Sequence, residues 1–243
     1  MNLIIDVGNT NVKLAVFDKN YLVIKETIKP SRIISSVNKL LKKFPQIDKS
    51  VISSVGKVKA SLLDKIRLKV QLLVLDANCK LPFKNLYKSP KTLGVDRIAL
   101  VSSAVQNYST RNVLIIDAGT CITYDFINNK NEYLGGAISP GIRQRYQSLN
   151  NLTANLPLLD TKLPEDITGT TTDESIHSGI IFGVLLEING VVTKYSEEFK
   201  ELTVILTGGD ADFLSNQLKS TIFANSNFLL EGLNFILEYN LSK

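Results

Sequence analysis

A short segment occurs twice in this chain of 243 residues and constrains its fold more than any other feature. The sequence Leu-Ile-Ile-Asp-Val-Gly-Asn-Thr begins at Leu3, and Leu-Ile-Ile-Asp-Ala-Gly-Thr begins at Leu114. Each copy is an apolar run that ends at an aspartate and a glycine, and a second run of strand character follows it. Chance could repeat the apolar part, but the shared glycine and threonine favour a duplication. We therefore expect two similar halves, residues 1–110 and 111–243, with the two polar turns facing the cleft between them.

The polar turn of the first copy has the residue types of a phosphate-binding tip. Gly8 exposes backbone N–H groups, Asp6 can hold a metal ion, and Lys13 adds a positive charge. The alternative is a plain β-hairpin in which Lys13 extends from a strand edge into solvent. Asp6 and Asp117 each end an apolar strand, where an uncompensated charge is costly. A cation beside each aspartate is the simplest compensation.

Composition limits the class of protein. Hydrophobic residues make up 44% of the chain, which describes a globular protein with a sizeable core. Cys79 and Cys121 have neither CxxC nor zinc-type spacing, so we expect reduced thiols in a cytoplasmic protein, with a disulfide between them as the alternative. The single histidine, His177, is expected to be structural or exposed, which leaves no Ser-His-Asp or Cys-His nucleophile. We expect no signal peptide and no apolar run that approaches the length of a membrane span.

Charge is distributed unevenly along the chain. Residues 1–110 carry 19 Lys and Arg against 7 Asp and Glu, a net charge of +12, whereas residues 111–243 carry 9 against 16, a net charge of −7. A basic half can attract nucleotides or nucleic acid. Because its lysines lack interleaved aromatic residues, solvated surfaces are favoured over nucleic-acid binding.

Apolar spacing predicts alternating strands and helices. Beyond the strand pairs of the two repeats, strands are expected at residues 21–28, 51–55, 70–75 and 204–206. Helices are expected at about 31–44, 61–69, 94–108, 173–191 and 229–237, with an irregular segment at 78–92 and a mobile connection at 150–168. Three glycines inside the fourth helix each cost about 1 kcal/mol relative to alanine, so tight packing against a neighbour is expected to offset them. They are Gly179, Gly183 and Gly190.

Several motifs resemble those of known kinases. Asp-x-Gly-Asn-Thr at Asp6, Asp-x-Gly-Thr at Asp117 and Thr-Gly-Gly at Thr207 resemble the three nucleotide-binding elements of the actin, Hsp70 and sugar-kinase superfamily. Further segments resemble the type III pantothenate kinases in particular, in the right order over nearly the whole chain. These segments are Tyr87, Pro90 and Gly94 to Arg97, then Gly135 to Gly141, and Gly169 to Thr172 followed by Ser178 to Ile180.

This resemblance implies a fold, an activity and its requirements. The fold would be α/β, actin-like (ribonuclease H-like) and duplicated, with two similar halves whose mixed sheets are flanked by helices. The activity would be ATP-dependent phosphorylation of the 4′-hydroxyl of pantothenate, the first committed step toward coenzyme A. Members of the family are homodimers that use Mg²⁺ with ATP and need a monovalent cation, potassium or ammonium.

The resemblance also assigns roles to residues of this chain. The first half would hold the ATP phosphate tip and the pantothenate loop, and the second half a second phosphate tip and the adenosine element. Asp96 would be the catalytic proton acceptor, Asp6 would hold Mg²⁺, and Asp117 would bind the monovalent cation. The ATP-binding residues would be Asp6, Val7, Gly8, Asn9, Thr10, Asn11, Val12, Lys13 and Thr120, with Thr207, Gly208 and Gly209. The pantothenate-binding residues would be Tyr87, Gly94, Val95, Asp96, Arg97 and Thr172.

Some of these residues have simpler explanations. Asp96 stands at a predicted helix start, where an aspartate is a favoured cap. Arg97 could bind the carboxylate of pantothenate or hold Asp96 in place. Tyr87 and Thr172 could be a loop aromatic and a helix-start hydroxyl. The chain also departs from the family at His177, where glutamine is usual, and at Val95, where a smaller residue is common.

Two other functions fit the same fold. One is a kinase for another small alcohol, which would differ in the pocket built from Tyr87 to Arg97 and Thr172. The other is a non-enzymatic transcriptional accessory protein that binds nucleic acid through the basic half. Retention of Asp6, Asp96 and Asp117 favours an enzyme, because a scaffold has no use for a catalytic base.

Overall fold

The protein folds into two compact units. The structure is a computed structural model and describes residues 1–243 except 9, 55, 57, 77, 219–221 and 242–243. Unit 1 comprises Met1–Ser109, Asn131–Tyr133 and Asn227–Lys243, and unit 2 comprises Thr110–Lys130 and Leu134–Ser226. The chain passes from unit 1 to unit 2 between Ser109 and Thr110, next to the boundary expected after residue 110. The C-terminal segment Asn227–Lys243 belongs to unit 1 again.

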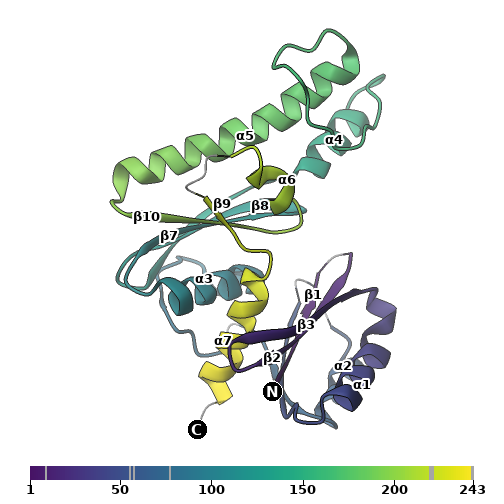
Figure 1. Ribbon diagram of the computed structural model, residues 1–243, viewed down its shortest axis with the longest axis vertical. Coiled ribbons are helices and arrows are strands. Elements are labelled where there is room, and N and C mark those ends of the chain that lie inside the picture. Colours follow the sequence, from purple (N-terminus) through teal and green to yellow (C-terminus); the bar gives the residue numbers. More distant parts are fainter. Residues whose placement is uncertain (9, 55, 57, 77, 219–221, 242–243) are drawn as a thin grey trace. The chain divides into compact units, whose positions relative to one another are not determined.

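The sheet of unit 1 has five strands in the order β3-β2-β1-β4-β5 (Figure 1). The strands are β1 (Asn2–Val7), β2 (Val12–Asp18), β3 (Tyr21–Ile28), β4 (Lys49–Ser54) and β5 (Gln71–Val74). Strands β1, β2 and β3 are antiparallel neighbours, whereas β4 runs parallel to β1 and β5 runs parallel to β4. The hairpin predicted for the first repeat is confirmed.

Helices cover both faces of β1, whose residues Leu3, Ile4 and Ile5 are fully buried. Leu3 and Ile5 belong to a core that includes residues of α1 (Ile33–Lys43) and α2 (Ala60–Arg67). Strand alternation turns Ile4 to the other face. There α3 (Val95–Tyr108) contacts β4, and α7 (Phe228–Leu241) contacts both β1 and β4. A strand covered on both sides reads as a continuous apolar run, as this one does.

Unit 2 repeats this topology. Its strands are β7 (Asn112–Ala118), β8 (Cys121–Ile127), β9 (Glu132–Pro140), β10 (Leu202–Thr207) and β11 (Ile222–Ala224), in the order β11-β10-β7-β8-β9. Counted from the first strand of each unit, both sheets have the order 3-2-1-4-5, and the LIID segments form the two central strands. The duplicated, actin-like α/β fold with mixed sheets is therefore confirmed.

Short elements complete the loops between these strands. Short 3₁₀ helices occur at Pro30–Arg32 and Pro90–Thr92. The segment expected to be irregular also contains β6 (Lys84–Asn85), which pairs with Glu132 and Tyr133, the part of β9 that belongs to unit 1. Unit 2 contains α4 (Ile142–Asn151) and the short α6 (Ala211–Ser215).

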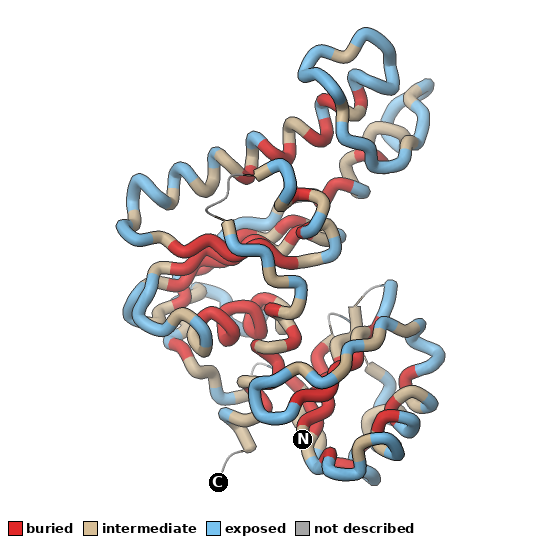
Figure 2. Tube along the Cα trace, in the orientation of Figure 1, coloured by how far each residue is buried: buried red, intermediate tan, exposed pale blue. Residues whose placement is uncertain are grey.

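The longest helix is α5 (Thr172–Glu198) of unit 2. It begins with a capping box in which Thr171 and Glu174 bond reciprocally to each other's backbone N–H groups. Its buried residues pack on β7, β8 and β10, as the burial colours of Figure 2 show along the inner side of the helix. By length and composition alone α5 could cross a membrane, so the expectation that no apolar run approaches that length was wrong. Core helices of soluble proteins pass the same test.

The C-terminal helix α7 completes the core of unit 1. It packs closely on α3, and a Cβ atom at Gly232 would overlap the carbonyl oxygen of Ala99. The buried Asn234 accepts a hydrogen bond from the Asn2 amide at 2.8 Å and donates one to the Lys19 carbonyl at 2.8 Å. These bonds connect α7 to β1 and to the turn between β2 and β3.

We predict that Gly232→Ala destabilises the protein by about 1–3 kcal/mol, because the added methyl group must push α7 away from α3. The measurement is the free energy of unfolding from chemical denaturation. The control is Asn38→Ala at an exposed position of α1, which should change that free energy by less than about 0.5 kcal/mol. Equal values for Gly232→Ala and wild type would contradict the close packing.

Candidate active site

Asp6 lies at the end of the central strand of unit 1 between two polar neighbours. In the strand register it stands opposite Lys13 on β2 and Ser53 on β4. The Ser53 hydroxyl donates a hydrogen bond of 2.8 Å to Asp6 Oδ1. Burial raises the pKa of the Asp6 carboxyl above its ordinary value, and the charge of Asp96 adds to this, whereas the Ser53 bond and the charge of Lys13 oppose it. Its neighbours therefore compensate the ionised form of the Asp6 carboxyl only in part.

The turn after Asp6 is closed by a hydrogen bond of 3.1 Å from the Gly8 N–H to the Asn11 carbonyl. Thr10 and Asn11 are exposed, and the Asn11 amide oxygen accepts a bond of 3.0 Å from Lys29. Val12 is fully buried, so only its backbone can face a ligand. Val7 is partly exposed, and Asn9 lies outside the described residues.

Asp96 occupies the first turn of α3, as its spacing from Gly94 predicts. Its Oδ1 accepts a hydrogen bond of 2.9 Å from the Arg97 backbone N–H. A Cβ atom at Gly94 would overlap this oxygen, so a larger residue there would displace the Asp96 carboxylate. Asp96 and Asp6 are close enough for the charge of one to act on the other. Unit 1 thus brings two carboxylates and Lys13 into one region.

Arg97 lies between two aromatic rings. Its guanidinium carbon is 5.5 Å from the ring centroid of Tyr87 and 5.9 Å from that of Tyr133, and the side chain is only 5% exposed. These distances suit cation–π attraction. The Tyr87 N–H donates a bond of 2.9 Å to Asn85 Oδ1, which fixes the loop that carries the ring. The motifs do not reveal Tyr133 or Ser53, since both reach the site through pairing of strands that are distant in sequence.

In unit 2 the segment from Thr207 to Gly209 lies beside the second aspartate turn. Thr207 on β10 stands opposite Asp117 on β7, and its side chain is 2% exposed. Gly208 has a φ of +100°, and a Cβ atom there would overlap Asp117 Oδ1 and the Ala118 carbonyl. The structure therefore brings Asp117 and the Thr-Gly-Gly segment together. Thr120 is exposed in the turn, and Gly209 is also exposed.

Asp117 also has a hydroxyl neighbour on its other side. Thr123 stands opposite Asp117 on β8, in the position that Lys13 occupies relative to Asp6. Thr123 Oγ1 is buried and has no hydrogen-bond partner among the described residues. A buried hydroxyl oxygen without a partner beside a carboxylate is a suitable ligand pair for a small cation.

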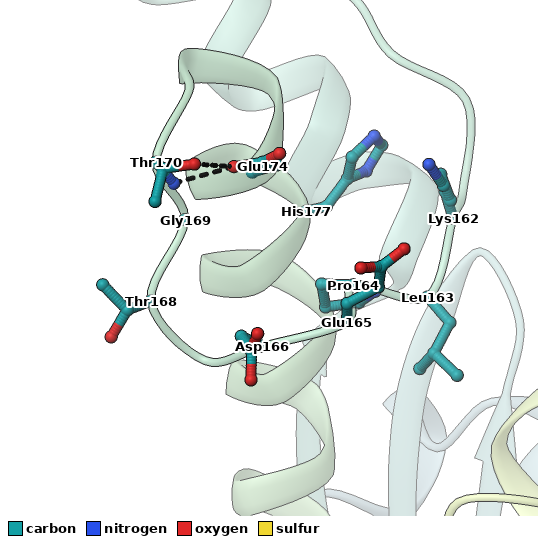
Figure 3. A pocket seen from close by; sticks show the side chains of 10 residues that line it. All are labelled: Lys162, Leu163, Pro164, Glu165, Asp166, Thr168, Gly169, Thr170, Glu174 and His177. Atoms are coloured by element: carbon teal, nitrogen blue, oxygen red, sulfur yellow. Dashed lines mark hydrogen bonds between the residues drawn. The ribbon is translucent and has the colours of Figure 1, made fainter.

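Thr172 is exposed at the start of α5 and lines an open groove of about 610 Å³ in unit 2. A cavity of about 260 Å³ adjoins the same loop and is lined by Lys162 and His177 among others (Figure 3). The His177 Nδ1 atom and the Tyr146 hydroxyl are hydrogen-bonded at 2.7 Å. His177 is thus partly buried and bonded to α4.

No group of three or more His, Cys, Asp and Glu side chains that could hold a metal ion occurs in the described part of the chain. A divalent ion at Asp6 would therefore need most of its ligands from water or from a bound molecule. Mg²⁺ in phosphate-transferring sites has this kind of shell, with one or two carboxylates and the phosphates of the substrate. The raised pKa of Asp6 fits such a partner.

Comparison with known proteins agrees with this arrangement. The sequence model of the type III pantothenate kinases matches residues 2–194. The type III pantothenate kinase of Christiangramia forsetii is 52% identical over 240 residues and that of Flavobacterium johnsoniae 44% identical over 241, with 99% of each chain covered in both cases. The crystal structure of a glucokinase from an Antarctic psychrotroph has a TM-score of 0.55 at 14% identity, covers 98% of both chains and supports the fold alone. This chain belongs to the type III pantothenate kinase family.

Proposed function

We propose that the protein transfers the γ-phosphoryl group of ATP to the 4′-hydroxyl of pantothenate, the first step of coenzyme A biosynthesis. The observation that carries this proposal is the identity of 52% to a type III pantothenate kinase over 99% of both chains. A kinase for another small alcohol and a non-enzymatic accessory protein are not favoured by these relatives. The enzyme would act in the cytoplasm.

The first turn would bind the phosphates of ATP. Lys13 would supply a point charge for a β- or γ-phosphate, and the backbone of the turn from Asp6 to Val12 would approach the phosphates closely. Asp6 would hold Mg²⁺, with its carboxylate oriented by the hydrogen bond that Ser53 donates to Oδ1. When bound, the ion neutralises negative charge on the transferring phosphoryl group.

Asp96 would accept the proton of the pantothenate hydroxyl. The Arg97 N–H anchors Oδ1, which leaves Oδ2 to receive the proton. Phosphoryl transfer proceeds through a loose transition state, so the carboxylate need only orient the hydroxyl and take its proton late. This role is compatible with the position of Asp96 at a helix start, since one oxygen serves the helix and the other the substrate.

The remaining residues would shape the pantothenate pocket. Gly94, Val95 and Thr172 are partly or fully exposed and could contact the substrate. Arg97 is 5% exposed, which favours the second of its two roles, holding Asp96 and the Tyr87 ring in place.

Asp117 would bind the monovalent cation, potassium or ammonium. The Thr123 hydroxyl beside it, for which the described residues offer no hydrogen-bond partner, supports this assignment, because threonine and carboxylate oxygens are ligands that such cations accept. Thr120 would contact ATP from the exposed turn. Thr207 is buried, so the adenosine contact would come from the backbone of Gly208 and Gly209.

The protein would act as a homodimer through the outer face of α5. Gly179, Gly183, Leu186 and Gly190 share that face by their spacing, and Leu186 is 63% exposed. A Cβ atom at any of these glycines would meet no atom of the described residues within 4 Å, so the part of the chain that the structure describes supplies no neighbour that offsets their cost. A second copy packed on the stripe would supply that neighbour and bury the leucine.

We predict ADP release that requires ATP, Mg²⁺, pantothenate and potassium or ammonium together. Asp96→Asn should lower kcat by about 100-fold or more and retain nucleotide binding, because only the proton acceptor is lost. Coupled ADP detection measures kcat, and calorimetry measures nucleotide affinity. The control is Asp173→Asn, which changes an aspartate at the same position of α5 and should leave kcat within about twofold of wild type.

No turnover of pantothenate by wild-type protein with both cations present would contradict the proposed reaction. If another hydroxylated acceptor in a substrate panel turned over faster than pantothenate, that compound would be assigned as the substrate. Equal losses of kcat in Asp96→Asn and Asp173→Asn would assign Asp96 to helix capping alone.

We predict that Asp6→Asn weakens Mg²⁺-dependent nucleotide binding but raises the Tm of the ligand-free protein. The folded-state pKa of Asp6 lies above its ordinary value of 3.8, so the ionised form costs stability. The loss of stability therefore grows as the pH rises from 3.8 through the raised pKa of the folded state. Asparagine does not ionise, so Asp6→Asn does not lose this stability. Thermal melts from about pH 4 to about pH 8 should show the Tm advantage of Asp6→Asn growing with pH. An advantage that is independent of pH would contradict this origin.

We predict that Leu186→Lys shifts the protein from dimer to monomer, because a charge at the centre of the stripe would be buried without a partner. Sedimentation velocity measures the mass. Ser196→Lys on another side of α5 is the control and should remain dimeric. A monomeric wild type would contradict the dimer, and a dimeric Leu186→Lys would move the interface elsewhere.

A further inference from the structure

We propose that Ser53 is a positioning residue that holds the Asp6 carboxylate in the orientation needed by the metal–nucleotide complex. The inference rests on the proposed function, because it takes the role of Asp6 from there. None of the sequence motifs includes Ser53, and its position opposite Asp6 follows from the parallel pairing of β1 and β4.

The hydrogen bond of Ser53 is committed to Asp6. The Oγ atom lies 2.8 Å from Asp6 Oδ1, and Ser53 is 2% exposed. A hydroxyl group has one proton to donate, and at this burial water offers no competing acceptor. The bond therefore fixes the rotation of the carboxylate and assigns one oxygen to the protein and the other to a ligand.

Without Ser53 the carboxylate would have a different preferred partner. Lys13 stands opposite Asp6 on the other neighbouring strand, and its charge already attracts the carboxylate. A carboxylate released from Ser53 could turn toward Lys13 and form an ion pair. That pair would remove a metal ligand and a phosphate-binding charge at the same time. Ser53 thus keeps the two groups separate for two different parts of the nucleotide.

The duplicated half contains the same pattern. Thr207 on β10 stands opposite Asp117 as Ser53 stands opposite Asp6, and each hydroxyl residue is 2% exposed. Burial of a hydroxyl in a strand costs free energy unless a bond compensates. In both units a buried hydroxyl residue lies on the neighbouring strand directly opposite the aspartate. This repetition favours a role tied to the aspartates rather than to strand packing.

Calorimetric titration of ADP with and without Mg²⁺ tests this role apart from catalysis. Ser53→Ala should weaken the Mg²⁺-dependent affinity by about tenfold, the usual loss when a partner of a metal ligand is removed, and should weaken metal-free ADP binding by a smaller factor, because the freed carboxylate pairs with Lys13. Ser53→Thr retains the hydroxyl and should recover most of the affinity. The matched control is Ser50→Ala, because Ser50 lies on the same strand, is fully buried and has no hydrogen-bond partner for Oγ among the described residues.

The same titration with Asp6→Asn separates the two claims. If Asp6→Asn binds Mg²⁺ and ADP as tightly as wild type, the role of Asp6 in the proposed function fails. If Asp6→Asn weakens binding and Ser53→Ala does not, the role of Ser53 is overturned and that of Asp6 stands. The double variant should bind as Asp6→Asn does, since Ser53 acts only through Asp6.

Loss of folding is distinguished by circular dichroism and Tm. If Ser53→Ala is unfolded, Ser53→Cys replaces it, because the thiol keeps the shape and donates only weakly. An equal loss of affinity in Ser53→Ala and Ser50→Ala would show a general effect of β4 and overturn the inference.

Discussion

The candidate site depends on a carboxylate at the end of a central strand. Strand β1 is buried up to Ile5, and Asp6 follows at its partly exposed end, where desolvation still raises the pKa of the carboxyl. Ser53 and Lys13 compensate part of the cost of this burial, yet the pKa stays above its ordinary value. On the proposed function, a cation bound beside Asp6 would offset this cost.

The charge of Asp96 further disfavours the ionised form of Asp6. A second carboxylate close to the first would normally be avoided, because each charge disfavours the other. At the start of α3 the Arg97 backbone N–H donates a hydrogen bond to Asp96 Oδ1, which stabilises the charge of this carboxylate. Arg97 itself is held between Tyr87 and Tyr133, so the residue that anchors Asp96 is rigid. A metal ion held by Asp6 would offset part of this repulsion and would leave Lys13 for a phosphate group.

Local pattern was sufficient to predict much of this fold from the sequence, but not its long-range pairings. The hairpin after Leu3, its repeat after Leu114 and the start of α3 follow from apolar periodicity and turn residues within short windows. Ser53 and Tyr133 could not be found in that way, since their neighbours are set by the pairing of β1 with β4 and of β6 with β9. The return of α7 to unit 1 depends on the packing of Gly232 on Ala99, which no local signal encodes. The apolar length of α5 was missed because glycines and polar residues interrupt its pattern.

The two turns share a scaffold but differ at one cross-strand position, and this difference argues for a division of labour. Asp6 faces Lys13, whereas Asp117 faces Thr123 at the equivalent place. A lysine attracts phosphate and repels a second cation, so the first turn suits a metal–phosphate complex in which the nucleotide supplies most ligands. The Thr123 hydroxyl, which has no hydrogen-bond partner within the described part of the chain, offers an oxygen and no repulsion, so the second turn would suit a monovalent cation. Duplication thus provides two carboxylates at equivalent places in the two sheets. On the proposed function, the residue on the neighbouring strand would decide which kind of ion each one accepts.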